Sequence, residues 1–348
     1  MQQSKTFLEY VPERWRADAL RMAEALRNGN RFIVSGHVNP DGDALGSVAA
    51  LGHILRFLGK EYVLYSSTGI YDYLTFLPLP GVLRSSLGTL PFAPSAALVA
   101  DCSEARRVGG DLEGLLESLP VVNIDHHPGE PMPAAARWIE PEAAATAQLA
   151  AYVGLALGVP PTGDFAQAIM LGLITDTGGF QHGNTSADVL RLSALLVENG
   201  CDLPGLRERI ESSWSMGRLR LWVRALGGVR CARRGSIALC VVTLEDLRQC
   251  GARKEDCEGI VDQIRRLQGV RMAALLREDA PGVFKLSMRS SGATSVRDVA
   301  ACFGGGGHRN AAGGLLTMAR SAAEEAVLAA AAARLDKEDG ENGASAAD

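Results

Sequence analysis

The sequence predicts an α/β protein with two domains. The first is a doubly wound, mainly parallel sheet with helices on both faces, and a helical linker joins it to a smaller α/β domain. Three observations support this. The 348 residues exceed one ordinary hydrophobic core. Short apolar runs alternate with helical patterns in the first half, as in βαβ units. Polar clusters directly follow several apolar segments, and ligands of open α/β sheets bind beyond the carboxyl ends of the strands.

The composition is that of a globular protein, with 47% hydrophobic and 22% charged residues. Aromatic residues make up only 5%, so the sequence does not predict a stacking track for long nucleic acid. We expect no membrane association, because no apolar run approaches the roughly 20 residues of a membrane span. Residues 1–10 lack the pattern of a secretory signal. Seven cysteines without a C-x-x-C pair favour a reducing, cytoplasmic location.

The net charge of −5 is unevenly distributed. Residues 216–334 contain 19 lysines and arginines against 11 aspartates and glutamates, a net charge of +8 that leaves −13 for the remainder. One interpretation is an acidic part that binds cations and a basic part that binds phosphates. The other is a chance distribution of solvated helix faces.

The first domain is expected over residues 1–190. Buried strands are predicted where short apolar runs stop at polar or turn residues: 31–36, 61–66, 96–100 and 121–124. Helices are predicted from apolar spacing and from end signals such as Asn28-Gly29 and Gly59: 11–29, 44–58, 142–157 and 164–175. Residues 67–96 predict only one short helix, near 71–77. A capping box at Thr185–Asp188 opens a further helix that ends at Glu198.

The composition of the remaining chain indicates a linker, a second domain and a tail. Residues 191–227, which include a polar, arginine-rich helical stretch over 203–226, are expected to form the linker. A second domain is expected over residues 228–335. Its strands are predicted at 229–232, 236–243, 270–277, 283–288 and 314–318, and its helices at 256–267, 296–302 and 321–335. Residues 336–348 are small and acidic, which predicts a disordered tail.

The loop after the first strand carries three side chains of the metal-binding type, His37, Asp41 and Asp43. If the backbone is extended there, the two carboxylates diverge, which suits two different ions better than one. Gly42 allows the loop to turn tightly. The alternative is an Asp-Gly turn in which Asp43 caps the following helix.

Three further acidic positions end apolar segments. Asp101 follows a strand and is by itself compatible with an ordinary turn or helix cap. The triplet Asp125-His126-His127 is harder to explain structurally, because buried titratable groups are costly unless they are paired or bound to metal. Asp176 ends a helix, where its charge opposes the helix dipole and calls for a compensating cation.

These residues together suggest a metal-dependent reaction. Carboxylates and imidazoles without thiolates suit Mn²⁺ or Mg²⁺ and argue against a structural zinc site. Two such ions about 3.5–4 Å apart activate a water and stabilise the attacking and leaving oxygens of an in-line displacement. That chemistry is phosphoester hydrolysis.

The second domain offers groups that suit an anion. Gly304–Gly307 precede His308, and a glycine run lets backbone amides approach a phosphate closely. Its alternative is a flexible surface turn. Lys285, Ser287 and Arg289 alternate along a predicted strand and therefore share one face, on which Arg289 provides a bidentate fork. A solvated strand face is the alternative.

With these residues assembled, the chain resembles the DHH phosphoesterase superfamily over roughly residues 15–335. It is most similar to the subgroup with a DHH-associated C-terminal domain, which degrades nano-RNA and dephosphorylates 3′-phosphoadenosine 5′-phosphate. The family motifs are matched in order. They are His37-Val-Asn-Pro-Asp41-Gly-Asp43, Asp101, Asp125-His126-His127, Asp176-Thr-Gly and Phe303-Gly-Gly-Gly-Gly-His308-Arg-Asn.

The resemblance implies two divalent cations, Mn²⁺ or alternatively Mg²⁺. His37, Asp41 and Asp101 would hold one ion. The other would be held by Asp43, Asp101, His126 and Asp176, with Asp101 bridging. His127 would face the substrate phosphate, and Asp125 would lie behind the ligands to orient an imidazole.

The resemblance also implies that the second domain recognises the nucleotide. The substrate-binding residues would be Arg289, Ser287, Gly305, Gly306, Gly307 and His308. Arg107 matches a recurrent family position whose role, structural or functional, stays open. The chain departs from many relatives at Gly179, where a larger polar residue is common, which leaves the contacts of the loop up to His182 open.

We therefore expect a manganese-dependent phosphoesterase that acts on short RNA oligonucleotides or on 3′-phosphoadenosine 5′-phosphate. A phosphodiesterase for cyclic or linear dinucleotides is the alternative, and an inorganic pyrophosphatase fits the second domain less well. A non-catalytic nucleotide-binding regulator would not need all six candidate metal ligands. The preferred substrate, the direction of hydrolysis and whether the protein forms a homodimer are left open.

Overall fold

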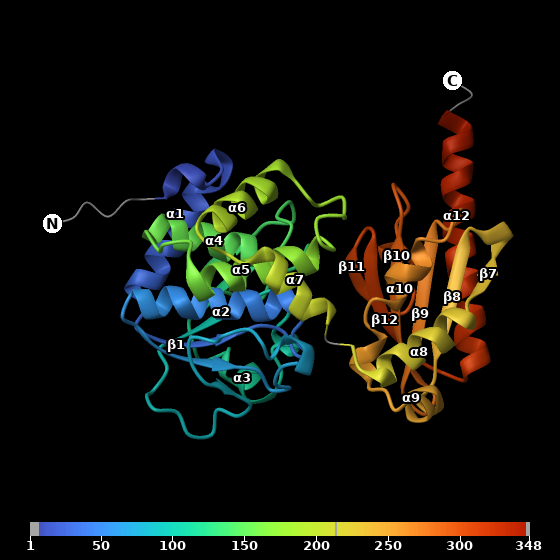
Figure 1. Ribbon diagram of the computed structural model, residues 1–348, viewed down its shortest axis with the longest axis horizontal. Coiled ribbons are helices and arrows are strands. Elements are labelled where there is room, and N and C mark those ends of the chain that lie inside the picture. The colour runs from blue at the N-terminus through green and yellow to red at the C-terminus, as the bar shows by residue number, and fades with distance from the viewer. Residues whose placement is uncertain (1–6, 213, 346–348) are drawn as a thin grey trace. The chain divides into compact units, whose positions relative to one another are not determined.

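The computed structural model describes residues 7–212 and 214–345, the last five of them by their helical backbone alone. The chain divides into two compact units, Met1–Ser213 and Trp214–Asp348. Each unit contains one six-stranded sheet (Figure 1). All seven cysteines are free thiols.

Within the described ranges, none of the helices combines the length and the apolar character needed to cross a membrane.

The first unit contains a parallel sheet in the strand order β3-β2-β1-β4-β5-β6. The strands are β1 (Arg31–Ser35), β2 (Glu61–Tyr65), β3 (Leu83–Arg84), β4 (Ala96–Ala100), β5 (Val121–Asp125) and β6 (Ala136–Ile139). From β1 the strand order continues through β2 to β3 on one side, and through β4 and β5 to β6 on the other. A crevice is therefore expected between the carboxyl ends of β1 and β4, where connections leave in opposite directions.

Helices cover the two faces of this sheet unequally. One face packs against a core formed with α1 (Glu13–Asn28), α2 (Gly42–Phe57), α4 (Thr146–Leu157), α5 (Gly163–Asp176), α6 (Ala187–Glu198) and α7 (Leu203–Glu211). The other face is covered by α3 (Gly110–Leu115) and loops. Alternation along β1 explains the two faces, because Phe32 and Val34 belong to the first core and Ile33 to the second. The predicted doubly wound sheet is confirmed.

The second unit contains a mixed sheet in the order β11-β12-β10-β9-β8-β7. The strands are β7 (Arg230–Ala232), β8 (Ile237–Val242), β9 (Met272–Ala280), β10 (Val283–Ser290), β11 (Gly306–His308) and β12 (Ala311–Thr317). Only the β8–β9 pair is parallel. The strands predicted at 229–232 and 236–243 are present as the antiparallel β7–β8 pair.

Both faces of the second sheet are covered over β8 and β9. One core contains α11 (Arg297–Ala301) and α12 (Arg320–Ser345). The other contains α8 (Met216–Gly227), α9 (Leu244–Cys250) and α10 (Ile260–Arg265). Short 3-10 helices complete the described elements: η1 (Leu8–Tyr10), η2 (Asp72–Leu74), η3 (Ala105–Arg107), η4 (Arg233–Gly235) and η5 (Lys254–Cys257).

The units divide differently from the predicted domains. Helices α6 and α7 belong to the first unit, because their apolar residues, such as Leu206, join its core. Helix α8 belongs to the second unit, where Leu221 and Trp222 are buried. The boundary therefore lies between residues 213 and 214 instead of within a separate linker over 191–227.

The prediction of a disordered tail from residue 336 is wrong for 336–345, which continue α12. Arginines from distant strands and turns offset the acidic charge of this helix. Arg233 pairs with Asp336 and Asp339, and Arg271 pairs with Glu338 and Asp339. Residues 346–348 lie outside the described part.

Candidate metal centre

The metal-type side chains of the first unit converge at the carboxyl edge of its sheet. The loop after β1 contributes His37 and leads into Asp41 and Asp43 at the start of α2. Asp101 directly follows β4, Asp125 ends β5, and Asp176 ends α5. Because the carboxyl ends of parallel strands share one edge, residues far apart in sequence meet there.

The start of α2 separates Asp41 from Asp43. Oδ1 of Asp41 accepts hydrogen bonds from the backbone N–H groups of Asp43 and Ala44, both at 3.0 Å, so Asp41 is the N-cap. The expected extended backbone is wrong here, because Gly42 already begins the helix. The alternative with Asp43 as the cap is also wrong. The carboxylates still diverge, because Asp41 faces His37 whereas Asp43 faces His126.

The first cluster consists of His37, Asp41 and Asp101. Nε2 of His37 lies 3.4 Å from Oδ2 of Asp101 and 3.9 Å from Oδ2 of Asp41. Nδ1 of the same ring lies 2.8 Å from the carbonyl oxygen of Val38, which can only accept. Nδ1 therefore carries a proton, and Nε2 is the ring atom that faces the carboxylates.

The second cluster consists of Asp43, His126 and Asp176. Nε2 of His126 lies 3.2 Å from Oδ2 of Asp176 and 3.8 Å from Oδ2 of Asp43. Its Nδ1 lies 3.2 Å from the carbonyl oxygen of Ala143, so this ring too directs Nε2 to the carboxylates.

Asp101 faces both clusters with different oxygens. Oδ2 faces His37, whereas Oδ1 lies 3.6 Å from Nε2 of His126. The residue is 1% exposed, and its φ is +55°, an uncommon value for a residue other than glycine. This position and conformation suit a carboxylate shared between two ions.

Burial and mutual repulsion shift the pKa values of these groups. Burial, together with the charges of Asp101 and Asp176, raises the pKa of Asp43. Burial alone would lower the pKa of His37, but its hydrogen bond to Asp101 and the nearby carboxylates raise it to about 9. Burial would raise the pKa of Asp101, but the neighbouring histidines hold it well below its usual range. Buried acids that repel one another call for a cation.

The geometry and the chemistry of the clusters both fit divalent metal ions. Ligand atoms bound about 2.1 Å from one ion at right angles are about 3 Å apart. The measured separations in the two clusters begin at 3.2 Å, and the candidate ligand atoms of each cluster all lie within 4.8 Å of one another. The donors are carboxylates and imidazoles, which suit hard or borderline divalent ions.

Asp125 holds His127. Its Oδ1 lies 2.8 Å from Nδ1 of His127 and accepts the backbone N–H of the same residue at 3.0 Å. Ser103 donates a hydrogen bond to the other carboxylate oxygen. Asp125 is fully buried, whereas the His127 side chain is 27% exposed. The acid therefore holds the imidazole of His127 in one orientation, with Nδ1 facing Asp125.

Several groups around the clusters were not predicted. Ser103 bonds Asp125, and Ala143 bonds His126 through its carbonyl group. The backbone N–H groups of Thr146 and Ala147 bond Asp43, and the hydroxyl of Thr146 bonds Asp101. The sequence placed Thr146 in an alanine-rich helix, and no local signal linked it to aspartates 45 and 103 positions earlier.

Two other predicted residues support the loops of the site. The carbonyl oxygen of Arg107 accepts the N–H of Val38 at 2.7 Å and so anchors the loop of His37. Nδ1 of His182 lies 3.3 Å from the carbonyl oxygen of Asp176. Gly179 has a φ of +70°, a conformation that glycine adopts without strain.

The predicted substrate residues of the second unit lie in two rows across three strands. Ser287 and Gly306 both pair with Gly313, and Arg289 and His308 both pair with Ala311. Directly paired residues share a face, so each row presents its side chains on one side. Nε of Arg289 lies 3.1 Å from Oδ1 of Asp262, which restrains the guanidinium.

The glycine run allows two strands to approach closely. A Cβ at Gly305 would lie 2.0 Å from the carbonyl oxygen of Gly313, and one at Gly307 would lie 2.5 Å from that of Ala311. The alternative of a flexible surface turn is therefore wrong for Gly306 and Gly307, which belong to β11.

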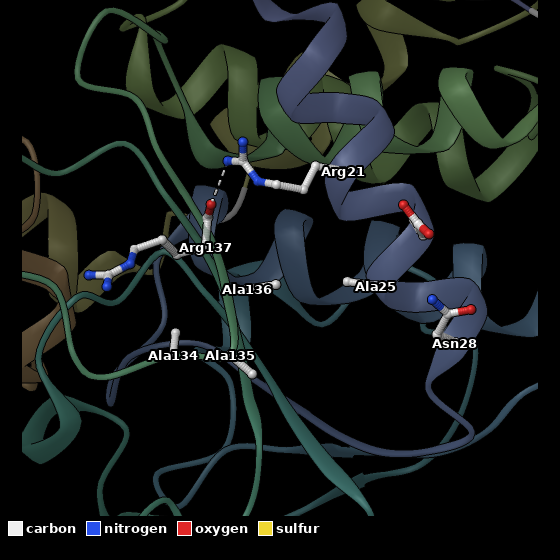
Figure 2. A pocket seen from close by; sticks show the side chains of 8 residues that line it. Arg21, Ala25, Asn28, Ala134, Ala135, Ala136 and Arg137 are labelled. Carbon is white, nitrogen blue, oxygen red and sulfur yellow. Dashed lines mark hydrogen bonds between the residues drawn. The ribbon is translucent and has the colours of Figure 1, made fainter.

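An open pocket of about 500 Å³ lies elsewhere in the first unit. It is lined by α1 and by the segment that enters β6, and Figure 2 shows Arg21 reaching the carbonyl oxygen of Arg137 at 2.9 Å. Alanines form half of its lining. The segment lies at the amino end of β6, so this pocket is not the metal centre.

The parallel sheet, the carboxylate and imidazole clusters at its switch point and the second α/β unit define a two-domain hydrolase of the phosphoesterase class. Comparison with known proteins makes the assignment specific. Residues 31–173 match the DHH family, N-terminal domain, and residues 236–337 match the DHHA1 domain. The chain belongs to the DHH family, which confirms the predicted resemblance.

Individual relatives agree with this assignment. The chain is 35% identical over 297 residues to the bifunctional oligoribonuclease and PAP phosphatase NrnA of Thermus thermophilus, covering 84% of this chain and 86% of the relative. It is 24% identical to NrnA of Bacillus subtilis, over 75% and 82% of the two chains. An exopolyphosphatase-related protein from Bacteroides fragilis shares the fold with a TM-score of 0.80, 24% identity and coverage of 91% and 96%.

Proposed function

We propose that this protein is a manganese-dependent phosphoesterase that hydrolyses short oligoribonucleotides and 3′-phosphoadenosine 5′-phosphate to nucleoside monophosphates. The observation that carries the proposal is Asp101, a buried carboxylate whose two oxygens face two separate ligand clusters. The substrate class is supported by the names of the relatives, which act on oligoribonucleotides and PAP.

Each cluster would hold one divalent ion. His37, Asp41 and Asp101 would bind the first, and Asp43, Asp101, His126 and Asp176 the second. Two ions at this spacing neutralise phosphate charge and lower the pKa of a bound water. Manganese is favoured over magnesium because an imidazole takes part in each cluster.

His127 would act on the substrate phosphate. Asp125 keeps its Nδ1 occupied and its ring in one orientation, so Nε2 is the atom that meets the phosphate. From there the imidazole stabilises negative charge on the phosphate or donates a proton to the leaving oxygen. Removing Asp125 would leave His127 in place but free to rotate.

The second unit would recognise the nucleotide. Arg289 has a guanidinium that Asp262 already restrains, His308 lies in the same row, and Ser287 lies in the other row. The glycine backbone at 305–307 would approach a phosphate without hindrance from side chains. A net charge of −5 and few aromatic residues argue for short substrates and against a long nucleic-acid track.

The test is hydrolysis by wild type and by Asp43→Ala of a labelled trinucleotide and of 3′-phosphoadenosine 5′-phosphate, with and without Mn²⁺. We expect activity only with the ion. The variant should lose on the order of 10³-fold or more, because metal stabilisation of the transition state is worth several kcal/mol. Stepwise shortening of the trinucleotide would also reveal the direction of hydrolysis.

The exposed Asp164→Ala provides the matched control, since it removes an aspartate away from the clusters. Full activity of Asp43→Ala, or equal activity of wild type in the presence of a chelator, would refute the metal assignment. A linear dinucleotide assayed in parallel tests the alternative, and activity confined to it would support that substrate.

A further inference from the structure

The start of α4 contacts proposed ligands of both ions, although none of its residues is a ligand. The N–H groups of Thr146 and Ala147 donate to Oδ2 and Oδ1 of Asp43 at 2.6 and 2.8 Å. The Thr146 hydroxyl donates to Oδ1 of Asp101 at 2.9 Å. One turn of helix therefore contacts a carboxylate from α2 and a carboxylate that follows β4.

The contact with Asp43 arises from how α4 begins. The first N–H groups of a helix lack partners within it, and Ala145, the N-cap, has no side chain that could accept from them. The two carboxylate oxygens of Asp43, which belongs to α2, accept hydrogen bonds from these N–H groups instead. Both α4 and Asp43 are buried, so the carboxylate is held by two backbone donors that cannot move independently.

The hydroxyl of Thr146 has a separate effect on Asp101. It binds Oδ1, the oxygen that faces His126, while Oδ2 faces His37. Asp101 presents one oxygen to each cluster only if its carboxylate does not rotate about the Cβ–Cγ bond. The hydroxyl donates to Oδ1, which also lies 3.4 Å from Nδ1 of His127, and so favours the orientation in which Asp101 faces both clusters.

We propose that Thr146 is a positioning residue for cation binding: its hydroxyl keeps Asp101 in the bridging orientation, and its backbone N–H helps to hold Asp43. The inference rests on the proposed function, because it concerns the same pair of ions. It adds a residue that the motifs of the chain did not identify.

Three variants of Thr146 separate the effect of the hydroxyl from that of packing. Thr146→Val keeps the shape and the backbone donor but removes the hydroxyl, whereas Thr146→Ser keeps the hydroxyl and removes a methyl group. Thr146→Ala differs from Thr146→Ser only by the missing hydroxyl. This comparison replaces the valine variant if that variant does not fold. Circular dichroism and thermal unfolding of the metal-free proteins establish folding.

The readout is calorimetric titration of the metal-free proteins with Mn²⁺. Loss of a partner that orients a metal ligand typically weakens metal binding 10- to 100-fold. We expect Thr146→Val and Thr146→Ala to bind at least one of the two ions about 10- to 100-fold more weakly. Thr146→Ser should stay within about threefold of wild type. At low Mn²⁺ the two variants without a hydroxyl should lose kcat, with KM little changed, and excess Mn²⁺ should restore it.

The outcomes distinguish the two proposals. Wild-type Mn²⁺ affinity in Thr146→Val, or equal weakening in Thr146→Ser and Thr146→Val, would overturn the positioning role alone, because wild type still binds the ions. A wild-type protein that binds no Mn²⁺ at all would overturn both proposals.

Discussion

Close helix contacts hold the candidate metal centre at the scale of single residues. Helices α2 and α5 meet through glycines: a Cβ at Gly46 would lie 2.4 Å from the carbonyl oxygen of Ala168. A Cβ at Gly172 would lie 2.6 Å from Oδ1 of Asp43 and 2.5 Å from Cβ of Ala147. Gly172 therefore lies directly behind a proposed ligand and the helix turn that holds it.

We expect Gly172→Ala to disturb both stability and metal binding. The added methyl group has no space and must displace Asp43 or α4, and such overpacking typically costs about 1–3 kcal/mol. Urea unfolding should show this loss. Titration with Mn²⁺ should show an affinity lower by about tenfold or more.

The control is Gly114→Ala in α3, where an added Cβ would meet nothing within 4 Å. Alanine is the better helix former, so this change should leave metal binding unchanged and stabilise the protein by up to about 1 kcal/mol. Equal effects of the two substitutions would contradict the close-packing argument.

At the scale of elements, α12 connects strands and loops of the second unit through Glu338. This carboxylate accepts hydrogen bonds from Arg271 at 2.7 Å, from Thr294 at 2.9 Å and from the N–H of Ser295 at 3.2 Å. Arg334 lies 3.1 Å away on the same helix. The loop that follows β10 and Arg289 is thereby held by a helix segment that the sequence assigned to a disordered tail.

Glu338→Ala should destabilise the second unit by about 1–3 kcal/mol, because it leaves buried donors of Thr294 and Ser295 without their acceptor. Chemical unfolding monitored by circular dichroism would measure the loss. The exposed Glu325→Ala on the same helix is the control and should change stability by less than about 0.5 kcal/mol. A wild-type unfolding midpoint in Glu338→Ala would show that the network contributes nothing.

At the scale of the whole molecule, each unit has its own hydrophobic cores. Two clusters of buried residues belong to the first unit and two to the second. The proposed ion ligands all lie in the first unit. Binding of Mn²⁺ should therefore stabilise one unit specifically.

Calorimetric unfolding should show two transitions, of which Mn²⁺ raises only one. At a free ion concentration 100 times the Kd, binding adds about 2.7 kcal/mol, which corresponds to roughly 5–10 °C in Tm for a unit of this size. A chelator should reverse the shift. Shifts of both transitions by the same amount would contradict the assignment of the ligands to one unit.

Local patterns of apolar and turn residues predicted most of the helices and strands. The apolar runs at 31–36 and 96–100 became β1 and β4 because buried central strands have a strong sequence signal. The strands β3, β6 and β11 were missed because they are short, lie at or near sheet edges and carry few buried apolar residues. The helix expected over 256–267 is divided near Gly259, whose φ is +88°.

The candidate site likewise combines residues that the sequence predicted with contacts that it did not. Clustered acids and histidines after apolar runs were enough to single out His37, Asp101, Asp125 and their neighbours. Their roles as ligands remain proposals that the titrations above would test. The hydrogen bond between Thr146 and Asp101 could not be predicted from the sequence. It joins residues 45 positions apart, and no local pattern encodes the fold that brings them together.

The sequence by itself determined the two α/β parts, the family and the candidate metal-binding residues, because periodicity, turn residues and motif spacing are local properties of the chain. Only the tertiary structure decided which oxygen of Asp101 faces which histidine, that Asp43 completes the first turn of α4, and that residues 336–345 extend a helix. Each of these depends on groups distant in sequence satisfying one another's charges and hydrogen bonds, and that pairing exists only once the chain has folded.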